Sequence, residues 1–303
     1  MTPLAPGDRV AFIGLGTMGA AMAANISRAG FRLAVHTRTR ARAEALVASG
    51  ALWAETPGEA AREARALCLS LSDAADVQAV LFGAGGAAEA LAPGSIVIDF
   101  STIAPEEASR FAAMLAERGV AMLDSPVSGG PKGAAQATLT CMVGGDRSAF
   151  AAASALFSAV ARTVTHLGPA GSGQVCKAAN QLIICATMQA VAEGLALGAR
   201  AGLDVAAMRE ALLGGSARSA VLETHALRML EQRFSPPAFR AGLMRKDIRI
   251  ALAAAQVHGV FAPATAHAAQ MFEALANQGR DGEDCTVLGQ LVAELSGLAG
   301  VQG

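Results

Sequence analysis

Apolar and polar positions in the first half of the chain follow an alternating pattern. Short apolar runs rich in β-branched residues are separated by longer, Ala-rich stretches. The short runs predict strands over 10–14, 31–36, 67–71, 95–99, 121–123, 139–143 and 163–166. The longer stretches predict helices over 17–29, 40–49, 57–65, 75–82, 105–118 and 146–159. Strands that alternate with helices indicate parallel crossovers, so we expect a doubly wound α/β domain with a mostly parallel sheet.

The pattern changes beyond Gly173. No strand is predicted between this residue and Gly303. A long helix over 173–201 comes first, and breaks that contain Gly or Pro separate further helices after it. We therefore predict an α/β domain over 1–168 and an all-α domain over 169–303, joined by the long helix.

Length and charge fit two such domains and exclude some partners. The chain has 303 residues, and its 24 basic and 25 acidic residues give a net charge of -1 without a long block of one sign. Nucleic acid and anionic membranes are therefore not expected partners. The most apolar stretch, 182–199, is interrupted by Gln189 and Glu193, so we predict no transmembrane segment. With no secretory signal at the start, we expect a cytoplasmic protein.

The five cysteines do not form a motif. They are scattered, odd in number and contain no CxxC pair. We therefore expect neither a disulfide framework nor a metal site, and interpret the cysteines as small buried residues with free thiols.

A glycine-rich segment marks the first candidate site. The segment Gly14-Leu15-Gly16-Thr17-Met18-Gly19 follows the first predicted strand and opens the first predicted helix. Gly14 permits a tight turn, Gly16 removes a side chain that would block a pyrophosphate, and Gly19 lets helix and strand approach. The helix N-terminus would then stabilise the phosphates. A merely Gly-rich turn is the alternative, but the strand–turn–helix context favours dinucleotide binding and a Rossmann-like domain.

The end of the second predicted strand favours NADP over NAD. An acidic residue there would bind the ribose hydroxyls of NAD, but no acid occurs before Glu44. The segment instead offers the candidate cofactor-binding residues Thr37, Arg38, Thr39 and Arg42. Arginines form paired, charge-assisted hydrogen bonds to phosphate, which suits a 2′-phosphate. The alternative is a solvated basic start of a helix.

Lys177 and Asn180 lie one turn apart on the long predicted helix, and Gln181 shares their face. An amine beside a carboxamide can handle a proton while a nicotinamide handles a hydride. The alternative is a Lys that reaches solvent from an apolar helix.

A second small-residue segment, Ser128-Gly129-Gly130, can present backbone N–H groups and one hydroxyl to an anion. Its alternative is an ordinary loop bracketed by prolines.

Four separated blocks carry a family resemblance. They are residues 14–30, 124–134, 171–181 and 239–247, and they occur in order across nearly the whole chain. The chain resembles the β-hydroxyacid dehydrogenase family, which includes 3-hydroxyisobutyrate dehydrogenase, tartronate semialdehyde reductase (2-hydroxy-3-oxopropionate reductase) and glyoxylate/succinic semialdehyde reductases. The resemblance implies an NADP-binding domain followed by a helical substrate and oligomerisation domain, which in this family forms a homodimer or homotetramer.

The resemblance also implies roles for individual residues. Lys177 would be the catalytic acid/base and Asn180 would orient the substrate, while Ser128 to Gly130 would hold the substrate carboxylate. Thr102 would lie near the nicotinamide and substrate; otherwise it belongs to the N-cap region before Pro105. The remaining implied site residues are Gln181, Phe239 and Asp247 for the substrate and Leu71, Ser72 and Lys246 for the cofactor.

The signals for the substrate are mixed. Gln181 after Asn180 resembles the tartronate semialdehyde reductases, whereas the Thr37-Arg38-Thr39 segment resembles the NADP-preferring glyoxylate/succinic semialdehyde branch. We expect reversible reduction of a small semialdehyde or 2-oxo acid to its hydroxy acid with NADPH. The alternatives are an imine reductase of the same fold and a non-catalytic dinucleotide-binding scaffold or sensor, and the presence of Lys177 argues against both.

Overall fold

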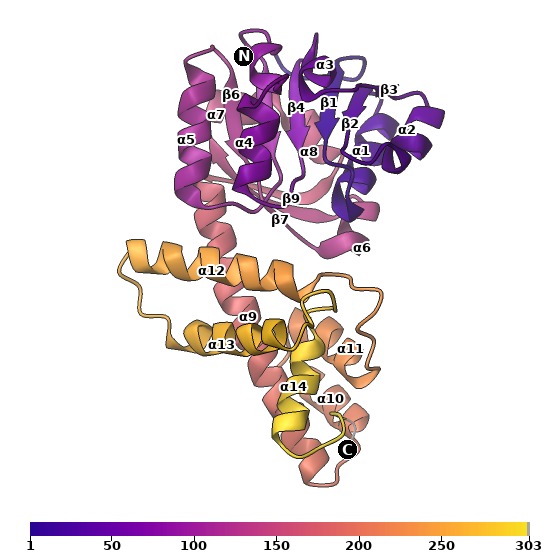
Figure 1. Ribbon diagram of the computed structural model, residues 1–303, viewed down its shortest axis with the longest axis vertical. Coiled ribbons are helices and arrows are strands. Elements are labelled where there is room, and N and C mark those ends of the chain that lie inside the picture. Colours follow the sequence, from indigo (N-terminus) through magenta and orange to yellow (C-terminus); the bar gives the residue numbers. More distant parts are fainter. Residues whose placement is uncertain (302–303) are drawn as a thin grey trace. The chain divides into compact units, whose positions relative to one another are not determined.

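The computed structural model describes residues 1–301, which form two compact units that divide after Lys177 (Figure 1). This division falls inside a helix, whereas the predicted boundary at 168/169 marks the change in secondary-structure pattern. The first turns of that helix therefore belong to the α/β unit. Lys177 is the last residue of the first unit.

The first unit is built on one nine-stranded sheet with the order β3-β2-β1-β4-β5-β6-β8-β7, in which β9 pairs with β8. β1 to β6 pair in parallel, as does β8 with β9, whereas β8 runs antiparallel to β6 and β7. This confirms the predicted mostly parallel sheet. The strands are β1 (Arg9–Ile13), β2 (Arg32–His36), β3 (Leu52–Trp53), β4 (Ala66–Leu69), β5 (Ile96–Asp99), β6 (Ala121–Asp124), β7 (Val127–Ser128), β8 (Leu139–Gly145) and β9 (Ala161–Gly168).

Helices cover both faces of this sheet because the side chains of a strand alternate in direction. Val10 and Phe12 of β1 pack in one core cluster with Met22, and Ala11 and Ile13 pack in another with Phe111. The α-helices are α1 (Thr17–Arg28), α2 (Glu44–Ala48), α3 (Pro57–Ala61), α4 (Ala74–Phe82), α5 (Pro105–Ala116), α6 (Gly130–Ala135), α7 (Arg147–Ala152) and α8 (Ser154–Ser158). Two short 3-10 helices, η1 (Arg40–Ala43) and η2 (Ala87–Glu89), complete the unit.

Some boundaries differ from the prediction. The helix predicted over 146–159 is two helices, α7 and α8, that meet at Ala153. The one predicted over 40–49 begins as the 3-10 helix η1 and continues as α2. The two-residue strands β3 and β7 were not predicted.

The second unit is helical, as predicted. In residues 178–301 the structure contains no strand, only an isolated bridge between Arg240 and Asp284. Its core is formed by apolar side chains that include Met188, Phe272 and Leu288. The helices are α9 (Ser172–Arg200), which begins in the first unit, α10 (Val205–Leu213), the π-helical turn η3 (Val221–His225), α11 (Ala226–Leu230), α12 (Ala241–Val257), α13 (Pro263–Asn277) and α14 (Val287–Leu295).

Helix α9 is long and apolar enough to cross a membrane by length and composition alone, and it is the single such helix within residues 1–301. Core helices of globular proteins pass the same test. Cys185, Met188 and Ala192 of α9 are fully buried in the core of the second unit, as in a core helix. The cytoplasmic location stays a prediction.

Candidate active site

The glycine-rich turn between β1 and α1 has the geometry that a dinucleotide requires. Gly14 has a φ of +95°, and a Cβ there would lie 2.3 Å from the carbonyl oxygen of Ser70. A Cβ on Gly19 would lie 1.9 Å from the carbonyl oxygen of Gly14, so both positions need glycine. A Cβ on Gly16 would meet no protein atom within 4 Å. The backbone beside Gly16 is therefore open to a ligand.

The N-terminus of α1 is free of competing negative charge. Its N-cap is Gly16, which has no side chain to bind the first N–H groups, and no acidic residue lies in the first turn. Unsatisfied N–H groups at a helix start, together with the helix dipole, favour an anion. The turn and helix therefore fit a cofactor pyrophosphate.

The end of β2 carries the basic residues predicted to bind a 2′-phosphate. The Arg38 side chain is 82% exposed, and its Nη2 lies 3.3 Å from Asp76 Oδ2 at the start of α4. Arg42 is exposed in η1. An exposed ion pair is weak, so Asp76 does not prevent Arg38 from binding a phosphate. Both the phosphate-binding interpretation and a solvated basic surface agree with this geometry.

The segments after β4 and β5 are tied together next to Thr102. The N–H of Leu71 donates to Ser101 Oγ at 2.9 Å, and the N–H of Ser101 donates to Asp99 Oδ1. Ser101 and Thr102 do not cap α5, because that helix begins at Pro105 and its N-cap is Ala104. The N-cap alternative is therefore wrong, and Ser101 instead joins two loops at the carboxyl edge of the sheet.

The start of α9 is bound to the same edge through Asp124, the last residue of β6. Asp124 Oδ1 accepts from Gly171 N at 2.8 Å, and Oδ2 accepts from Gln174 N at 2.9 Å. Burial raises the pKa of this carboxyl, and the helix N–H groups oppose that rise. Lys177 follows one turn later on α9.

Lys177 is buried and directed at the predicted carboxylate-binding segment. Its side chain is 8% exposed, so the alternative of a Lys that reaches solvent is wrong. Nζ donates to the carbonyl oxygen of Val127 at 3.0 Å. Val127 precedes Ser128 in β7, so the structure brings Lys177 and the Ser128 segment together.

The Ser128-Gly129-Gly130 segment is more regular than the ordinary loop that was its alternative interpretation. Ser128 ends strand β7, and Gly130 begins helix α6. Gly129 is the N-cap of α6 with a φ of +125°, and Gly130 has a φ of +61°. These values favour glycine at both positions. Turned backbone of this kind presents N–H groups to one side, as an anion-binding segment requires.

In the second unit, hydrogen bonds orient Asn180. Asp247 Oδ2 accepts from Gln181 Nε2 at 2.8 Å, and Gln181 Oε1 accepts from Asn180 Nδ2 at 2.8 Å. A carboxylate only accepts, so it fixes which way the Gln181 amide faces. Asn180 therefore donates to Gln181 and keeps its Oδ1 for another donor. Lys246 Nζ lies 3.2 Å from Asp247 Oδ1, so the two residues form an ion pair.

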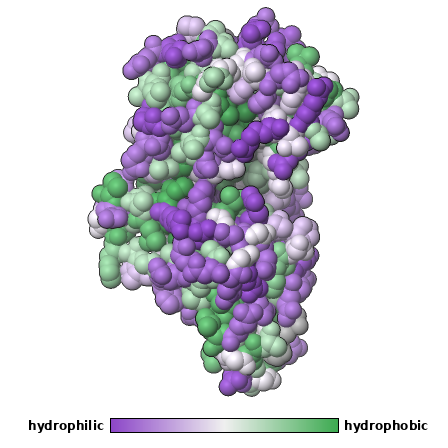
Figure 2. All heavy atoms as spheres, in the orientation of Figure 1, coloured by the Kyte–Doolittle hydropathy of each residue, from purple (hydrophilic) through white to green (hydrophobic). Residues whose placement is uncertain are grey.

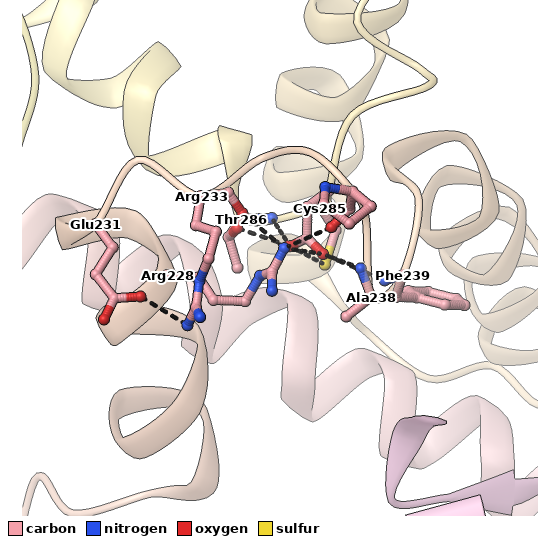
Figure 3. Close-up of polar contacts among 9 residues, drawn as sticks. Arg228, Glu231, Arg233, Ala238, Phe239, Cys285 and Thr286 are labelled. Atoms are coloured by element: carbon pink, nitrogen blue, oxygen red, sulfur yellow. Dashed lines mark hydrogen bonds and ion pairs between the residues drawn. The ribbon is translucent and has the colours of Figure 1, made fainter. Parts of the chain in front are cut away.

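Phe239 lies in a loop held by Asp284 and packs against the core of the second unit. The backbone N–H groups of Ala238 and Phe239, which Figure 3 labels, donate to Asp284 Oδ2 at 2.8 Å and 3.2 Å. The Arg228 guanidinium lies 3.3 Å from the same oxygen. This buried cluster sets the path of the chain into α12, which carries Lys246 and Asp247.

The cysteines have no assigned role in the candidate site. Cys68, Cys141, Cys185 and Cys285 are buried, and Cys176 is partly exposed. Burial raises the pKa of the Cys141 thiol to about 12. Among residues 1–301 no three His, Cys, Asp or Glu side chains are grouped so as to hold a metal ion.

Sequence reasoning missed three residues that support the site. Asp124 and Gln174 were present in the recognised blocks but had no assigned role. Asn25 of α1 donates from Nδ2 to Ala134 O at 2.7 Å, which ties the cofactor helix to α6. A buried Asn on an otherwise apolar helix face was the available signal.

Models of two protein families match the chain. The NAD binding domain of 6-phosphogluconate dehydrogenase matches residues 9–168, and the domain described as NAD-binding of NADP-dependent 3-hydroxyisobutyrate dehydrogenase matches residues 171–292. Together these matches span both units.

Relatives of known name and solved structures match the chain over nearly its whole length. A 2-hydroxy-3-oxopropionate reductase from Escherichia coli (strain K12) is 38% identical over 93% of this chain and 96% of its own. An NAD-dependent L-serine dehydrogenase from Pseudomonas aeruginosa is 37% identical over 93% and 97%. The crystal structure of 3-hydroxyisobutyrate dehydrogenase from Salmonella typhimurium has a TM-score of 0.86 at 30% identity, covering 94% of this chain and 99% of that one. A Streptomyces aurantiacus imine reductase is less similar, with a TM-score of 0.62 at 25% identity over 95% and 99%.

The matches to the family models and to the relatives include the four blocks that carry the resemblance, and they cover most of both units. The relatives named above act as dehydrogenases or reductases. The chain is therefore an NAD(P)-dependent oxidoreductase that acts on CH–OH groups, and it belongs to the β-hydroxyacid dehydrogenase family.

Proposed function

We propose that this enzyme uses NADP to interconvert a small β-hydroxy acid and its semialdehyde, as 3-hydroxyisobutyrate dehydrogenase or 2-hydroxy-3-oxopropionate reductase does. The observation that carries the proposal is the buried Lys177, whose Nζ donates to Val127 O beside Ser128. A buried amine next to a candidate anion-binding segment suits a substrate that has both a carboxylate and a reacting oxygen.

Each group has a defined task in this reaction. A nicotinamide cofactor bound at the glycine-rich turn would supply the hydride that the aldehyde carbon accepts. Lys177 donates a proton to the aldehyde oxygen, and in the reverse direction it accepts the proton of the hydroxyl. Ser128 Oγ and the N–H groups of Gly129 and Gly130 bind the carboxylate. Asn180, whose amide is oriented by Gln181 and Asp247, orients the substrate: its Oδ1 can accept from the substrate hydroxyl, and the second hydrogen of Nδ2 can donate to the aldehyde oxygen.

The remaining assignments concern the cofactor and the walls of the site. Gly14 to Gly19 bind the pyrophosphate. Arg38 and Arg42 bind the 2′-phosphate, and the neighbouring Thr37 and Thr39 also contact the cofactor. The other proposed contacts are those of Leu71, Ser72 and Lys246 with the cofactor, Thr102 with nicotinamide and substrate, and Phe239, Gln181 and Asp247 with the substrate. NADP is proposed over NAD because the end of β2 is basic and has no acid, although one relative is named as NAD-dependent.

Steady-state kinetics test the proposal. The panel contains tartronate semialdehyde, methylmalonate semialdehyde, succinic semialdehyde, glyoxylate and a cyclic imine, each with NADPH and with NADH. We expect the largest kcat/KM for a carboxylated aldehyde with NADPH. Turnover of the imine alone would favour an imine reductase, no turnover at all would favour a binding scaffold, and a preference for NADH would overturn the cofactor assignment.

We further propose that the chain forms a homodimer or homotetramer through its helical unit. Ile183 and Leu197 of α9 are exposed apolar residues, and Phe261 between α12 and α13 is almost fully exposed. Figure 2 shows hydrophobic atoms at the left edge, where the connection between α12 and α13 lies. Burying these side chains against a second copy would remove apolar surface from water, which favours association.

A further inference from the structure

The first turn of α9 packs closely against the sheet. A Cβ on Gly173 would lie 2.3 Å from Met142 O and 2.8 Å from Asp124 Oδ2. A Cβ on Gly144 would lie 2.5 Å from Asp124 Oδ1. The helix start, β6 and β8 therefore approach so closely that neither position has room for a side chain.

Asp124 supplies the bonds that hold this turn. Its two oxygens accept separately from Gly171 N and Gln174 N, which belong to the group of N–H donors that a helix start leaves without internal partners. A carboxylate at this position also interacts favourably with the helix dipole. Asp124 therefore fixes both the position and the rotation of α9 about its axis.

Gln174 connects the same turn to the segment that contains Thr102. The side chain is buried, Oε1 accepts from Ile103 N at 3.2 Å, and Nε2 donates to Ser101 O at 2.8 Å. These two backbone groups lie on either side of Thr102. Because Gln174 and Lys177 are three residues apart on one helix, the bonds of Gln174 link the position of Lys177 to that of Thr102.

We propose that Asp124 and Gln174 are positioning residues: they hold the start of α9 on the sheet edge so that Lys177 and Thr102 keep one arrangement. This inference rests on the proposed role of Lys177 as the proton donor. Neither residue touches the reacting atoms. A displacement of about 1 Å at a reacting group costs about 100-fold in rate, so the loss of either set of bonds should be visible in catalysis.

A double-mutant cycle tests the inference. Gln174→Met keeps the length of the side chain but removes both hydrogen bonds, and Asp124→Asn replaces one of the two acceptor oxygens with an NH2 donor. Each is measured alone and combined with Lys177→Ala. If both residues act through Lys177, each lowers kcat/KM by about 100-fold in the wild-type background and by less than about threefold in the Lys177→Ala background. Equal losses in both backgrounds would overturn the inference.

Controls separate positioning from a loss of folding. Circular dichroism and NADPH affinity are measured for every variant. Gln174→Asn keeps the amide but is one methylene too short for both contacts, so it should show the same coupling if Gln174→Met does not fold. Asp204→Asn changes an N-cap carboxylate of α10 that accepts from Ala206 N and Ala207 N, and it should leave kcat/KM unchanged.

The cycle also distinguishes the inference from the proposed function. If Lys177→Ala retains full activity on the best substrate, the proposed function fails and the inference falls with it. If Lys177→Ala is impaired but the losses are additive, the proposed function stands and only the positioning role is overturned.

Discussion

The spacing between Lys177 and Asn180 could not predict which atom of the Asn180 amide donates a hydrogen bond to Gln181. The sequence placed Lys177, Asn180 and Gln181 on one helix face. It could not tell that Gln181 is buried and takes its orientation from Asp247, because that carboxylate is brought in by a distant helix, α12. The predicted substrate contact of Gln181 stays a prediction, whereas its role in orienting Asn180 follows from the hydrogen bonds.

The basic end of β2 leads to a prediction about the cofactor. Arg38→Ala should raise the KM for NADPH by about 10- to 100-fold, because a charged hydrogen bond contributes about 1.5–3 kcal/mol. The KM for NADH should change little, since NADH has no 2′-phosphate. Kinetics with each cofactor at two salt concentrations measure this, and the NADPH penalty should shrink at high salt.

The matched control for this experiment is Arg118→Ala, which removes another exposed Arg after α5. It should leave both KM values unchanged. Equal effects of Arg38→Ala on NADPH and NADH would mean that Arg38 does not recognise the 2′-phosphate, and the basic segment would then be a solvated surface.

At the scale of elements, most of the Rossmann-like unit could be predicted because its strands are apolar runs separated by helices of adequate length. β3 and β7 were not predicted, because two residues are too few to show an alternation of apolar and polar side chains. β7 matters for the site, since Val127 accepts the hydrogen bond of Lys177 there. The contacts of Asp124 and Gln174 are long-range, so no local pattern indicates them.

The loop before α12 gives a prediction about stability. Asp284→Ala should destabilise the helical unit by about 3–5 kcal/mol, because it leaves Arg228 without its carboxylate in a mostly buried position. It also removes the acceptor for the N–H groups of Ala238, Phe239 and Thr286. Chemical denaturation followed by circular dichroism measures the change.

A second capping carboxylate provides the comparison. Asp204→Ala removes the exposed N-cap of α10 and should destabilise by only about 1 kcal/mol. If Asp284→Ala is no more damaging than Asp204→Ala, the buried cluster does not stabilise this unit as its contacts indicate.

At the scale of the whole molecule, the family and its two-part organisation were accessible from sequence because four blocks lie in order along the chain. The surface through which the proposed oligomer would form could not be predicted, because an exposed apolar residue such as Ile183 looks the same in sequence as a buried one. The double substitution Ile183→Glu with Leu197→Glu should convert the proposed oligomer to monomers, since charged residues disfavour burial at an interface. Light scattering coupled to size exclusion measures this, and a wild-type monomer would refute the oligomer outright.

The control for that measurement is Leu52→Glu, which places a charge on an exposed apolar residue of β3 in the first unit. It should leave the mass of the assembly unchanged. Loss of assembly with this variant as well would indicate general destabilisation instead of a specific interface.

The role of Lys177 in proton transfer is the central claim, and Lys177→Ala tests it most directly. NADPH consumption should fall by about 10²- to 10⁴-fold, the range that a general acid contributes, while NADPH still binds. Lys177→Arg should also be impaired, because a guanidinium does not give up its proton. Lys132→Ala, which removes an exposed lysine, should behave as wild type. A Lys177→Ala enzyme that turns over its best carboxylated aldehyde at the wild-type rate would contradict the account.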